Sequence, residues 1–159
     1  MSVSIRPARL SDADDIARLT TELGYDIAGS DVAPRLSRFL ESADHHFLIA
    51  EIDGHPVGWL HATLAEYVEA GRFVVVAGLV VDSRHRRKRV GSALMERAEQ
   101  WAVNQGCSML RLWSSSGRAH AHRFYEHLGF THIKTQFSFV KSLGSVGETL
   151  KKLVPRIDE

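Results

Sequence analysis

The chain has 159 residues, of which 44% are hydrophobic and 25% charged, and its formal net charge is +1. This length and composition predict one globular domain, and no second domain is required. The near-zero net charge argues against a molecule-wide field for nucleic acid or an anionic membrane. The sequence shows no secretory leader pattern and no apolar run of about 18 residues, and Cys107 is its single cysteine. We therefore expect a cytoplasmic protein without an internal disulfide bond.

The first forty residues predict one strand and two helices. Residues 3–8 have the pattern of a short strand. Ser11 followed by Asp14 resembles a capping box and predicts the start of the first helix. The second helix is predicted to follow Asp31, with Pro34 in its first turn, where a missing N–H costs little.

Residues 46–82 predict a hairpin followed by a central strand. Two β-rich runs flank Asp53-Gly54, a pair suited to the positive φ angles of a tight turn. The next run, Arg72 to Asp82, is apolar nearly throughout, which is typical of a strand that is covered on both faces. Gly78 in its middle predicts a bulge or a close approach by ligand or backbone.

The second half of the chain predicts alternating helices and strands after a short basic run. In order these are a helix from Val90 to Gly106, a strand at 107–114, a helix at 118–128 and a strand at 131–141. The whole order is β-α-α-β-β-β-α-β-α-β, which predicts a single α/β domain with a mixed sheet over residues 1–141. Residues 142–159 form a polar tail, with a short helix expected around 148–153, that is mobile or packs on a partner.

The basic run lies where the central strand gives way to a helix. A helix N-terminus offers unpaired N–H groups and the positive end of the helix dipole, and both favour an anion such as phosphate. Gly91 allows close approach and Ser92 adds a hydroxyl donor. The surrounding field comes from Arg86, Arg87, Lys88 and Arg89. Three interpretations remain open from composition alone: a solvated charge run, a nucleic-acid patch, or a site for a phosphate-bearing small ligand.

Two motifs give the chain a resemblance to the GNAT superfamily of N-acetyltransferases. "RRKRVG", residues 86–91, resembles the pyrophosphate loop [QR]-x-x-G-x-[GA], with Arg89 in place of the first glycine. "AHRFYEHLGF", residues 121–130, resembles A-x-x-F-Y-x-x-x-G-F at every marked position. The family's asparagine at the start of that second helix is Arg118 here. The resemblance covers about residues 4–141.

This resemblance implies a GNAT-like fold and an acetyl-CoA-dependent N-acetyltransferase. The sheet would be mixed but mostly antiparallel, with two splayed central strands that hold the pantetheine arm. The acceptor would be a primary amine of a small molecule or peptide, and neither a metal nor nucleic acid nor a membrane would take part. The residues implied to bind the cofactor are Leu79, Val80, Val81, Arg86, Arg87, Lys88, Arg89, Val90, Gly91, Ser92 and Arg118.

For the chemistry, the resemblance implies that Tyr125 assists departure of the thiolate. The group that takes the proton of the amine is left open. Some histone-type members have a glutamate in the fourth strand where this chain has Val75, so we consider Glu66, Glu69, His61 or a water chain.

The remaining expectations concern the acceptor and the partners. By resemblance, the acceptor would lie over the loops of the first two helices, where Tyr25, Asp26 and Asp31 could favour a cationic amine or serve only as turn and cap residues. A homodimer through the last strand and the tail is implied by the resemblance alone. Two alternative functions are kept: a non-catalytic acyl-CoA-binding or regulatory module, and a nucleic-acid-binding domain that uses residues 84–89.

Overall fold

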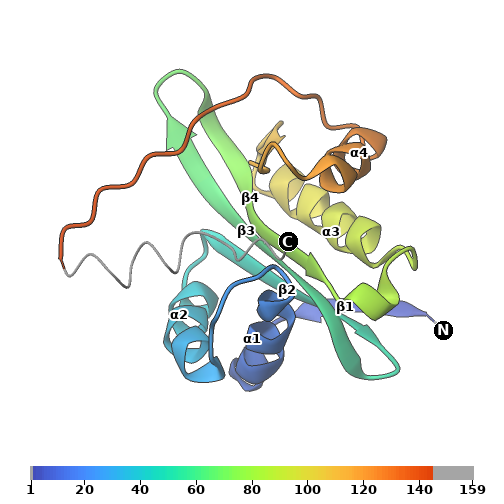
Figure 1. Ribbon diagram of the computed structural model, residues 1–159. Helices are drawn as coiled ribbons and strands as arrows, with labels where there is room; N and C mark the ends of the chain where they lie inside the picture. Colours follow the sequence, from blue (N-terminus) through green and yellow to red (C-terminus); the bar gives the residue numbers. More distant parts are fainter. Residues whose placement is uncertain (1, 145–159) are drawn as a thin grey trace.

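The computed structural model describes residues 2–144, and its centre is a five-stranded sheet (Figure 1). The strands lie side by side in chain order: β1 (Val3–Pro7), β2 (His45–Ile52), β3 (His55–Tyr67), β4 (Gly71–Val81) and β5 (Leu110–Arg111). The first four strands pair antiparallel, and β4 pairs with β5 in parallel. The predicted mixed, mostly antiparallel sheet in one α/β domain is therefore confirmed.

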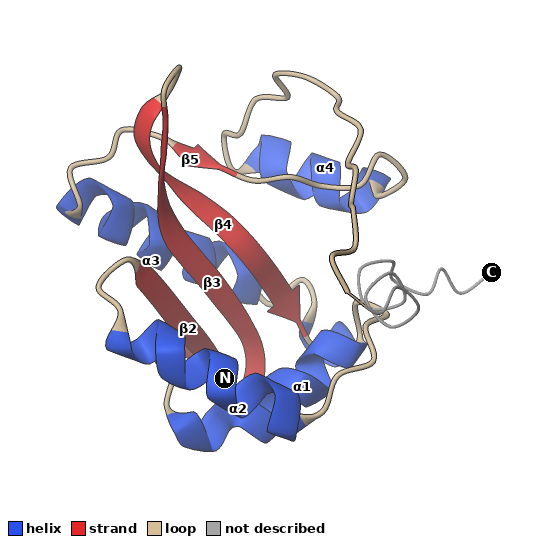
Figure 2. Ribbon diagram, turned by 90° about the vertical axis from the view of Figure 1, so that its left-hand side faces the viewer, coloured by secondary structure: helices blue, strands red, loops and turns tan. Residues whose placement is uncertain are grey.

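Helices cover both faces of this sheet (Figure 2). They are α1 (Ala13–Thr21), α2 (Gly29–Glu41), α3 (Val90–Asn104) and α4 (Ala119–His127), with short 3-10 turns at Leu10–Asp12 and Ser83–His85. One hydrophobic core joins α3 to the sheet through Leu48, Leu60, Val74, Leu94 and Met95, all buried. A second core joins α1 and α2 to the other face through Leu19, Leu36, Ile49, Trp59 and Val80.

The β2–β3 hairpin has the predicted turn. Asp53 and Gly54 have φ angles of 52° and 77°, which is the left-handed pair that a two-residue turn needs. The antiparallel register then places Phe47 opposite His61 and Ile49 opposite Trp59. Because side chains directly opposite one another share a face, these aromatic and histidine side chains lie together on the α1–α2 face.

The central strand β4 carries the predicted bulge. His61 of β3 pairs with Gly78, but the next residue, Ala62, pairs with Val76, so Ala77 is extra on β4. The space above Gly78 is filled by Trp59, whose ring atoms would lie 2.6 Å from a Cβ built on that glycine. Gly78 thus serves a close approach as well as a bulge.

Both N-terminal helices begin differently from the prediction. Ser11 lies in a 3-10 turn and caps nothing, and α1 starts at Ala13 because Asp12 is fixed by Arg6 at 2.8 Å and by the backbone N–H of Arg9 at 2.7 Å. The helix α2 starts at Gly29, before Asp31, so its Pro34 is the sixth helical residue rather than one of the first turn.

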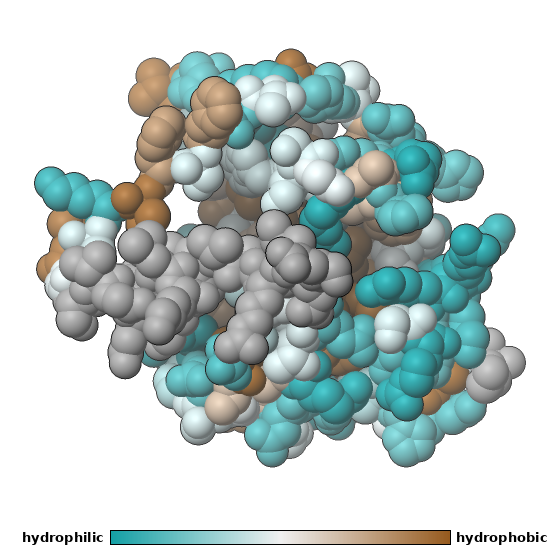
Figure 3. All heavy atoms as spheres, in the orientation of Figure 1, coloured by the Kyte–Doolittle hydropathy of each residue, from teal (hydrophilic) through white to brown (hydrophobic). Residues whose placement is uncertain are grey.

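The strand prediction for residues 131–141 was wrong. These residues form no helix or strand, and no backbone hydrogen bond joins them to a described strand. A strand needs a pairing edge, and the neighbouring strand β5 is only two residues long, much shorter than the predicted 107–114. The segment crosses the molecule as an extended connection, and its apolar side chains form part of the brown surface on the left of Figure 3.

The predicted short helix at 148–153, and most of the tail at 142–159, lie outside the described residues. Within residues 2–144, no helix is both long and apolar enough to cross a membrane. Cys107 is buried in the core that contains α3, with a relative exposure of 7%.

Candidate active site

The connection from β4 to α3 is anchored by one buried carboxylate. Asp82 is 1% exposed, and its Oδ1 accepts a hydrogen bond from the backbone N–H of Arg84 at 2.9 Å. Its Oδ2 accepts another from Nη2 of the same arginine at 2.9 Å. The Arg84 guanidinium and backbone N–H hold the pKa of Asp82 well below its usual range, so the carboxylate stays ionised. The first turn of the connection is thereby fixed to the end of β4.

A second set of contacts ties this connection to α1. Glu22 accepts a hydrogen bond from the backbone N–H of Ser83 at 2.8 Å. Arg18 lies 3.6 Å from Oδ2 of Asp82 and donates to the carbonyl oxygen of Pro56 at 3.1 Å. The basic residues that follow therefore begin from a segment that is fixed to β4 and α1.

The backbone of the basic run turns through two left-handed residues. Arg87 has φ 65° and Arg89 has φ 61°, ψ 19°. Such angles cost a residue with a Cβ about 1–2 kcal/mol. Arg89, at the position of the first glycine of the loop motif, thus lies in the left-handed region that a glycine adopts readily.

This bend leaves the N-terminus of α3 open. Arg89 is its N-cap and makes no side-chain capping bond, and the N–H of Ala93 is the first in the helix to find a carbonyl, that of Arg89 at 3.0 Å. Among the described residues, the N–H groups of Val90, Gly91 and Ser92 have no acceptor. These three donors, at the positive end of a 15-residue helix, fit a phosphate group.

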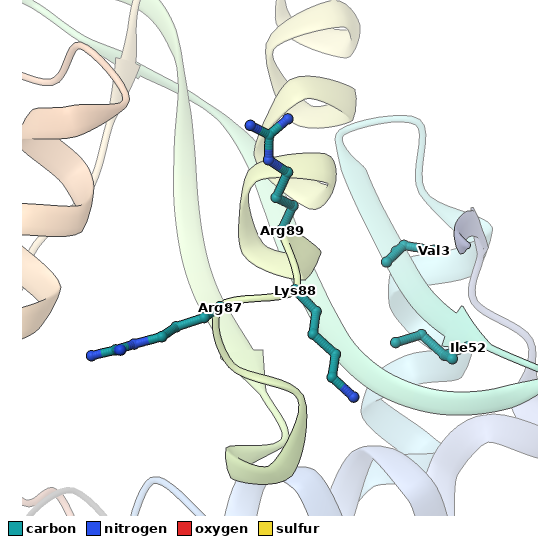
Figure 4. A pocket seen from close by; sticks show the side chains of 5 residues that line it. All are labelled: Val3, Ile52, Arg87, Lys88 and Arg89. Carbon is teal, nitrogen blue, oxygen red and sulfur yellow. The ribbon is translucent and has the colours of Figure 1, made fainter. Parts of the chain in front are cut away.

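The basic side chains diverge around this point instead of forming one patch. A hollow of about 450 Å³ is lined by Val3, Ile52, Arg87, Lys88 and Arg89. Figure 4 shows Arg87 pointing away from Val3 and Ile52, and Arg89 lying along α3. In Figure 3 hydrophilic surface gathers on the right, where Figure 1 places this connection. The charges thus surround the helix end and leave the N–H groups as the specific donors.

Gly91 brings α4 against the start of α3. A Cβ on Gly91 would lie 3.0 Å from Cζ of Phe124 and 3.7 Å from Cγ2 of Val81. Phe124 belongs to α4, so the glycine allows α4 to pack where β4 and α3 meet. The next residue along α4 is Tyr125.

Tyr125 is half-buried on the inner side of α4. Its ring packs against Phe124 and Phe130, with ring centroids 5.5 and 5.8 Å away. Burial raises the pKa of Tyr125, while the positive charge of Arg118 opposes that rise. The hydroxyl has no hydrogen-bond partner among residues 2–144. The structure thus places Arg118, predicted to bind the cofactor, within electrostatic reach of the predicted catalytic residue.

The two central strands separate beside this region. Pairing of β4 with β5 is confined to Val74–Leu110 and Val75–Arg111. Farther along, Leu79, Val80 and Val81 pair with β3 only. Their other edge has no strand partner within the described part of the chain, so its backbone donors and acceptors are open to a ligand.

The three candidate proton acceptors lie in different places. Glu66 is exposed opposite Arg72, and Glu69 lies in the turn between β3 and β4. His61 is opposite Gly78 at the bulge. Only His61 therefore adjoins the point at which β4 and β5 part.

A second histidine contacts His61, and this pair was not predicted from the sequence. Nδ1 of His45 lies 2.9 Å from Nε2 of His61, so one proton bridges the two rings. Phe39 and Phe47 pack on the rings. Burial and the neighbouring His45 lower the pKa of His61 to about 4, which leaves His61 neutral at pH 7. The pair arises from the β2–β3 register, for which the sequence offered only the alternating pattern.

The three residues predicted to lie near the acceptor, Tyr25, Asp26 and Asp31, differ in their positions. Asp31 accepts a hydrogen bond from the backbone N–H of Ala28 at 3.1 Å and so caps α2. Tyr25 and Asp26 lie in the connection between α1 and α2. Among residues 2–144, no group of three histidine, cysteine, aspartate or glutamate side chains is arranged to hold a metal ion.

Comparison with protein families matches residues 13–130 to the acetyltransferase (GNAT) family. The chain is 28% identical over 169 residues to thialysine N-epsilon-acetyltransferase of Mus musculus, covering 98% of this chain and 99% of that protein. It is 29% identical over 111 residues to N-acetylaspartate synthetase of Homo sapiens, covering 70% of this chain and 36% of that protein.

Solved structures show the same fold. The structure of AAC(6')-Iy in complex with the bisubstrate analogue CoA-S-monomethyl-acetylneamine superposes with a TM-score of 0.80 at 19% sequence identity. It covers 89% of this chain and 99% of that one.

Proposed function

The chain belongs to the acetyltransferase (GNAT) family, and from this premise we propose that it transfers the acetyl group of acetyl-CoA to a primary amine. The observation that carries the proposal is the open N-terminus of α3 beside the unpaired edge of β4. The first fits the pyrophosphate of the coenzyme and the second fits an extended arm that pairs as a strand would.

The groups that would hold acetyl-CoA follow from this geometry. The N–H groups of residues 90–92 would bind the pyrophosphate, and residues 86–89 with Arg118 would supply the surrounding positive charge. The backbone of residues 79–81 would pair with the pantetheine arm. When bound, acetyl-CoA supplies the thioester. An N–H near Gly78 is the donor proposed to polarise its carbonyl.

Tyr125 is proposed to hydrogen-bond to the leaving sulfur. A free phenol has a pKa of about 10 and a free thiol of about 8.5, so full transfer of the phenolic proton is uphill. Burial raises the pKa of Tyr125 and increases this gap. A hydrogen bond, or partial proton transfer, is therefore the role assigned to its hydroxyl.

His61 is proposed to relay the proton that the amine loses rather than to hold it, because a pKa of about 4 makes His61 a weak base. It adjoins Gly78, and its contact with His45 allows the proton to pass from one ring to the other. With Glu66 and Glu69 at the far end of the hairpin, His61 is preferred over either glutamate. A His61→Gln variant should lose turnover more than acetyl-CoA affinity, while Glu69→Gln should match the wild type. Equal turnover in both variants would remove His61 from the reaction.

The function is tested by thiol release from acetyl-CoA across a panel of amines. The relatives named for thialysine and for acetylaspartate act on amino acids by their names, so the panel includes amino acids beside polyamines and aminoglycosides. Calorimetry with acetyl-CoA runs in parallel. Binding without thiol release from any amine would favour the non-catalytic acyl-CoA-binding module. Salt-steep binding to DNA without coenzyme binding would favour the nucleic-acid alternative.

We also propose that the protein is located in the cytoplasm. A further proposal is a homodimer formed through residues 131–143. Support comes from four apolar side chains of this segment, Ile133, Phe137, Phe139 and Leu143, which are 70%, 89%, 91% and 93% exposed. A surface of this kind is typical of an interaction site. Light scattering should give twice the monomer mass, and a Phe137→Ser, Phe139→Ser double variant should give the monomer. A monomeric wild-type protein would end this proposal.

A further inference from the structure

Three aromatic rings surround the guanidinium of Arg111. Its Cζ lies 5.1 Å from the ring centroid of Phe73, 5.4 Å from that of Trp113 and 5.8 Å from that of Tyr67. The rings come from β3, β4 and the residues just after β5, and Tyr67 packs edge-on against Phe73. Contacts of this kind restrict the direction of the long arginine side chain.

The side-chain N–H groups of Arg111 have no acceptor among the described residues. Arg111 is partly buried, yet among residues 2–144 no oxygen accepts a hydrogen bond from its side chain and no carboxylate lies within 4.0 Å. Arg6, the other partly buried arginine among residues 2–144, is paired with Asp12 and Glu51. A guanidinium carries five N–H donors, and none of the side-chain nitrogens of Arg111 is fully buried, so they are accessible to a ligand. The arrangement therefore fits the binding of an anionic group.

The strand register places Arg111 in the proposed active site. His45 pairs with Thr63, Thr63 with Val75, and Val75 with Arg111, so these four residues form one row across the sheet. Leu110 and Leu112 pack into the core beneath α3, so the side chain of Arg111 lies on the opposite face, which is that of α1 and α2. The next row contains His61 and Gly78. Arg111 is the last β5 residue paired with β4, and it therefore stands where the two strands part.

We propose that Arg111 binds a carboxylate of the acceptor, so that the substrate is an amino acid or a similar amine that carries a carboxylate. This inference rests on the proposed acetyl transfer and names its substrate class. A planar carboxylate matches the fork of one guanidinium with two parallel hydrogen bonds. Its negative charge would also satisfy the partly buried cation.

The spacing of the two rows sets the length of this acceptor. Gly78 is one strand away from Arg111 and about two residues farther along, and the guanidinium leans toward Phe73, away from Gly78. With strands about 4.8 Å apart and about 3.3 Å per residue, the reacting centre and the guanidinium are on the order of 10 Å apart. Subtracting one hydrogen bond of about 3 Å leaves roughly 7 Å between the amine and the carboxylate. That separation favours a terminal side-chain amine over an α-amine.

The test compares each acceptor with its carboxamide, which keeps the amine and removes the negative charge. The pairs are lysine with lysinamide, ornithine with ornithinamide, and 2,4-diaminobutyrate with its amide. We expect the wild type to prefer each acid, with lysine giving the highest kcat/KM. In Arg111→Gln, the ratio of kcat/KM for lysine to that for lysinamide should fall about tenfold or more, as expected for a lost charge-assisted hydrogen bond. Arg111→Lys should restore part of this ratio. Arg72→Gln, which removes an exposed charge from the β3–β4 hairpin that carries Tyr67 and Phe73, should keep the wild-type ratio.

A binding measurement separates this inference from the proposed reaction. Nε-acetyllysine and its carboxamide are titrated calorimetrically in the presence of CoA, a readout that needs no turnover. Tighter binding of the acid that depends on Arg111, without thiol release from any amine, would support the carboxylate site and contradict the acetyl transfer. Thiol release with equal rates for acid and amide, in wild type and Arg111→Gln alike, would overturn the carboxylate site and leave the transfer standing. Equal or absent binding of both compounds would overturn it as well.

Discussion

Tyr125 shows how the surroundings of one residue limit its chemistry. Its ring packs between Phe124 and Phe130, and its hydroxyl has no partner among the described residues. Removing the hydroxyl should therefore disturb the reaction and leave packing intact. The expected role is local to the leaving sulfur and does not extend to binding of the coenzyme.

The first prediction is that Tyr125→Phe lowers turnover by at least about tenfold, because the donor to the leaving sulfur is lost. Acetyl-CoA affinity should change little, and the free energy of unfolding should change by less than about 0.5 kcal/mol because the ring is kept. Because burial raises the pKa of Tyr125, its ionisation should cause no loss of wild-type activity below about pH 10. Steady-state thiol release and calorimetry give these values. Unchanged turnover would exclude Tyr125 from the mechanism.

Arg89 shows a different kind of constraint, which lies in its backbone. Its φ of 61° carries a strain of about 1–2 kcal/mol, whereas Arg86 in the same loop has φ −63° and ψ 151° and is relaxed. Glycine costs about 0.5–1 kcal/mol in the entropy of the unfolded chain. The two effects oppose one another at Arg89, but only the second acts at Arg86.

We therefore predict that Arg89→Gly raises the free energy of unfolding by up to about 1 kcal/mol, while Arg86→Gly lowers it by about 0.5–1 kcal/mol. Both variants lose one positive charge from the same loop, so the comparison isolates the backbone effect. Urea unfolding measures both. If the two substitutions destabilise the protein equally, Arg89 is not strained in solution.

Among the elements, β4 combines three functions of the site. Its N-terminal part pairs with β5, its middle is bulged, and its last residues present an open edge. The bulge depends on Gly78, because the Trp59 ring occupies the place of a side chain there. Any added atom at this position must displace Trp59, which neighbours His61 on β3.

Gly78→Ala should accordingly lower the free energy of unfolding by about 1–3 kcal/mol, the usual cost of overpacking. It should also reduce turnover, since the displaced ring lies in the row next to His61. Gly117→Ala is the matched control, because a Cβ at Gly117 would meet nothing within 4 Å. Thermal unfolding of both variants checks the prediction, and equal melting temperatures would contradict the tight contact.

The elements also show what sequence patterns can and cannot supply. Local signals predicted the Asp53-Gly54 hairpin, the bulge at Gly78 and the helix at Val90, because each depends on neighbouring residues. The strand at 131–141 failed because an alternating pattern does not supply a partner edge. The His45–His61 pair and the rings around Arg111 depend on register between distant segments. Motifs thus located the proposed phosphate-binding end of the site, while the proposed acceptor end required the structure.

At the scale of the whole molecule, the site joins the two hydrophobic cores. The open end of α3 and Tyr125 adjoin the core on one face of the sheet, and His61 and Trp59 adjoin the core on the other. Asp82 and Glu22 connect the loop before α3 to α1, across the edge of the sheet. Groups that titrate in these contacts should therefore make global stability depend on pH.

Two histidines govern this dependence in mild acid. Burial and His45 lower the pKa of His61 to about 4, and burial with the charge of Arg97 lowers the pKa of His46. In the unfolded chain both titrate near 6.5. As pH falls from about 6.5 toward 4, the unfolded chain binds protons that the folded chain does not, so stability falls. Each histidine contributes a slope of at most about 1.4 kcal/mol per pH unit.

The carboxylates act in a separate window. Hydrogen bonds from Arg84 and Arg6 lower the pKa values of Asp82 and Asp12, so the stability they confer is lost mainly below about pH 4, where the unfolded carboxylates protonate. Urea unfolding at pH 7.5, 6.5 and 5.5 therefore reports chiefly the histidines, and the carboxylates begin to contribute at pH 4.5. We predict that the free energy of unfolding decreases as the pH falls over this range. Its slope against pH should be smaller in His61→Gln. A wild-type stability that stays constant from pH 6.5 to 4.5, or an unchanged slope in the variant, would show that His61 remains solvated in the folded protein.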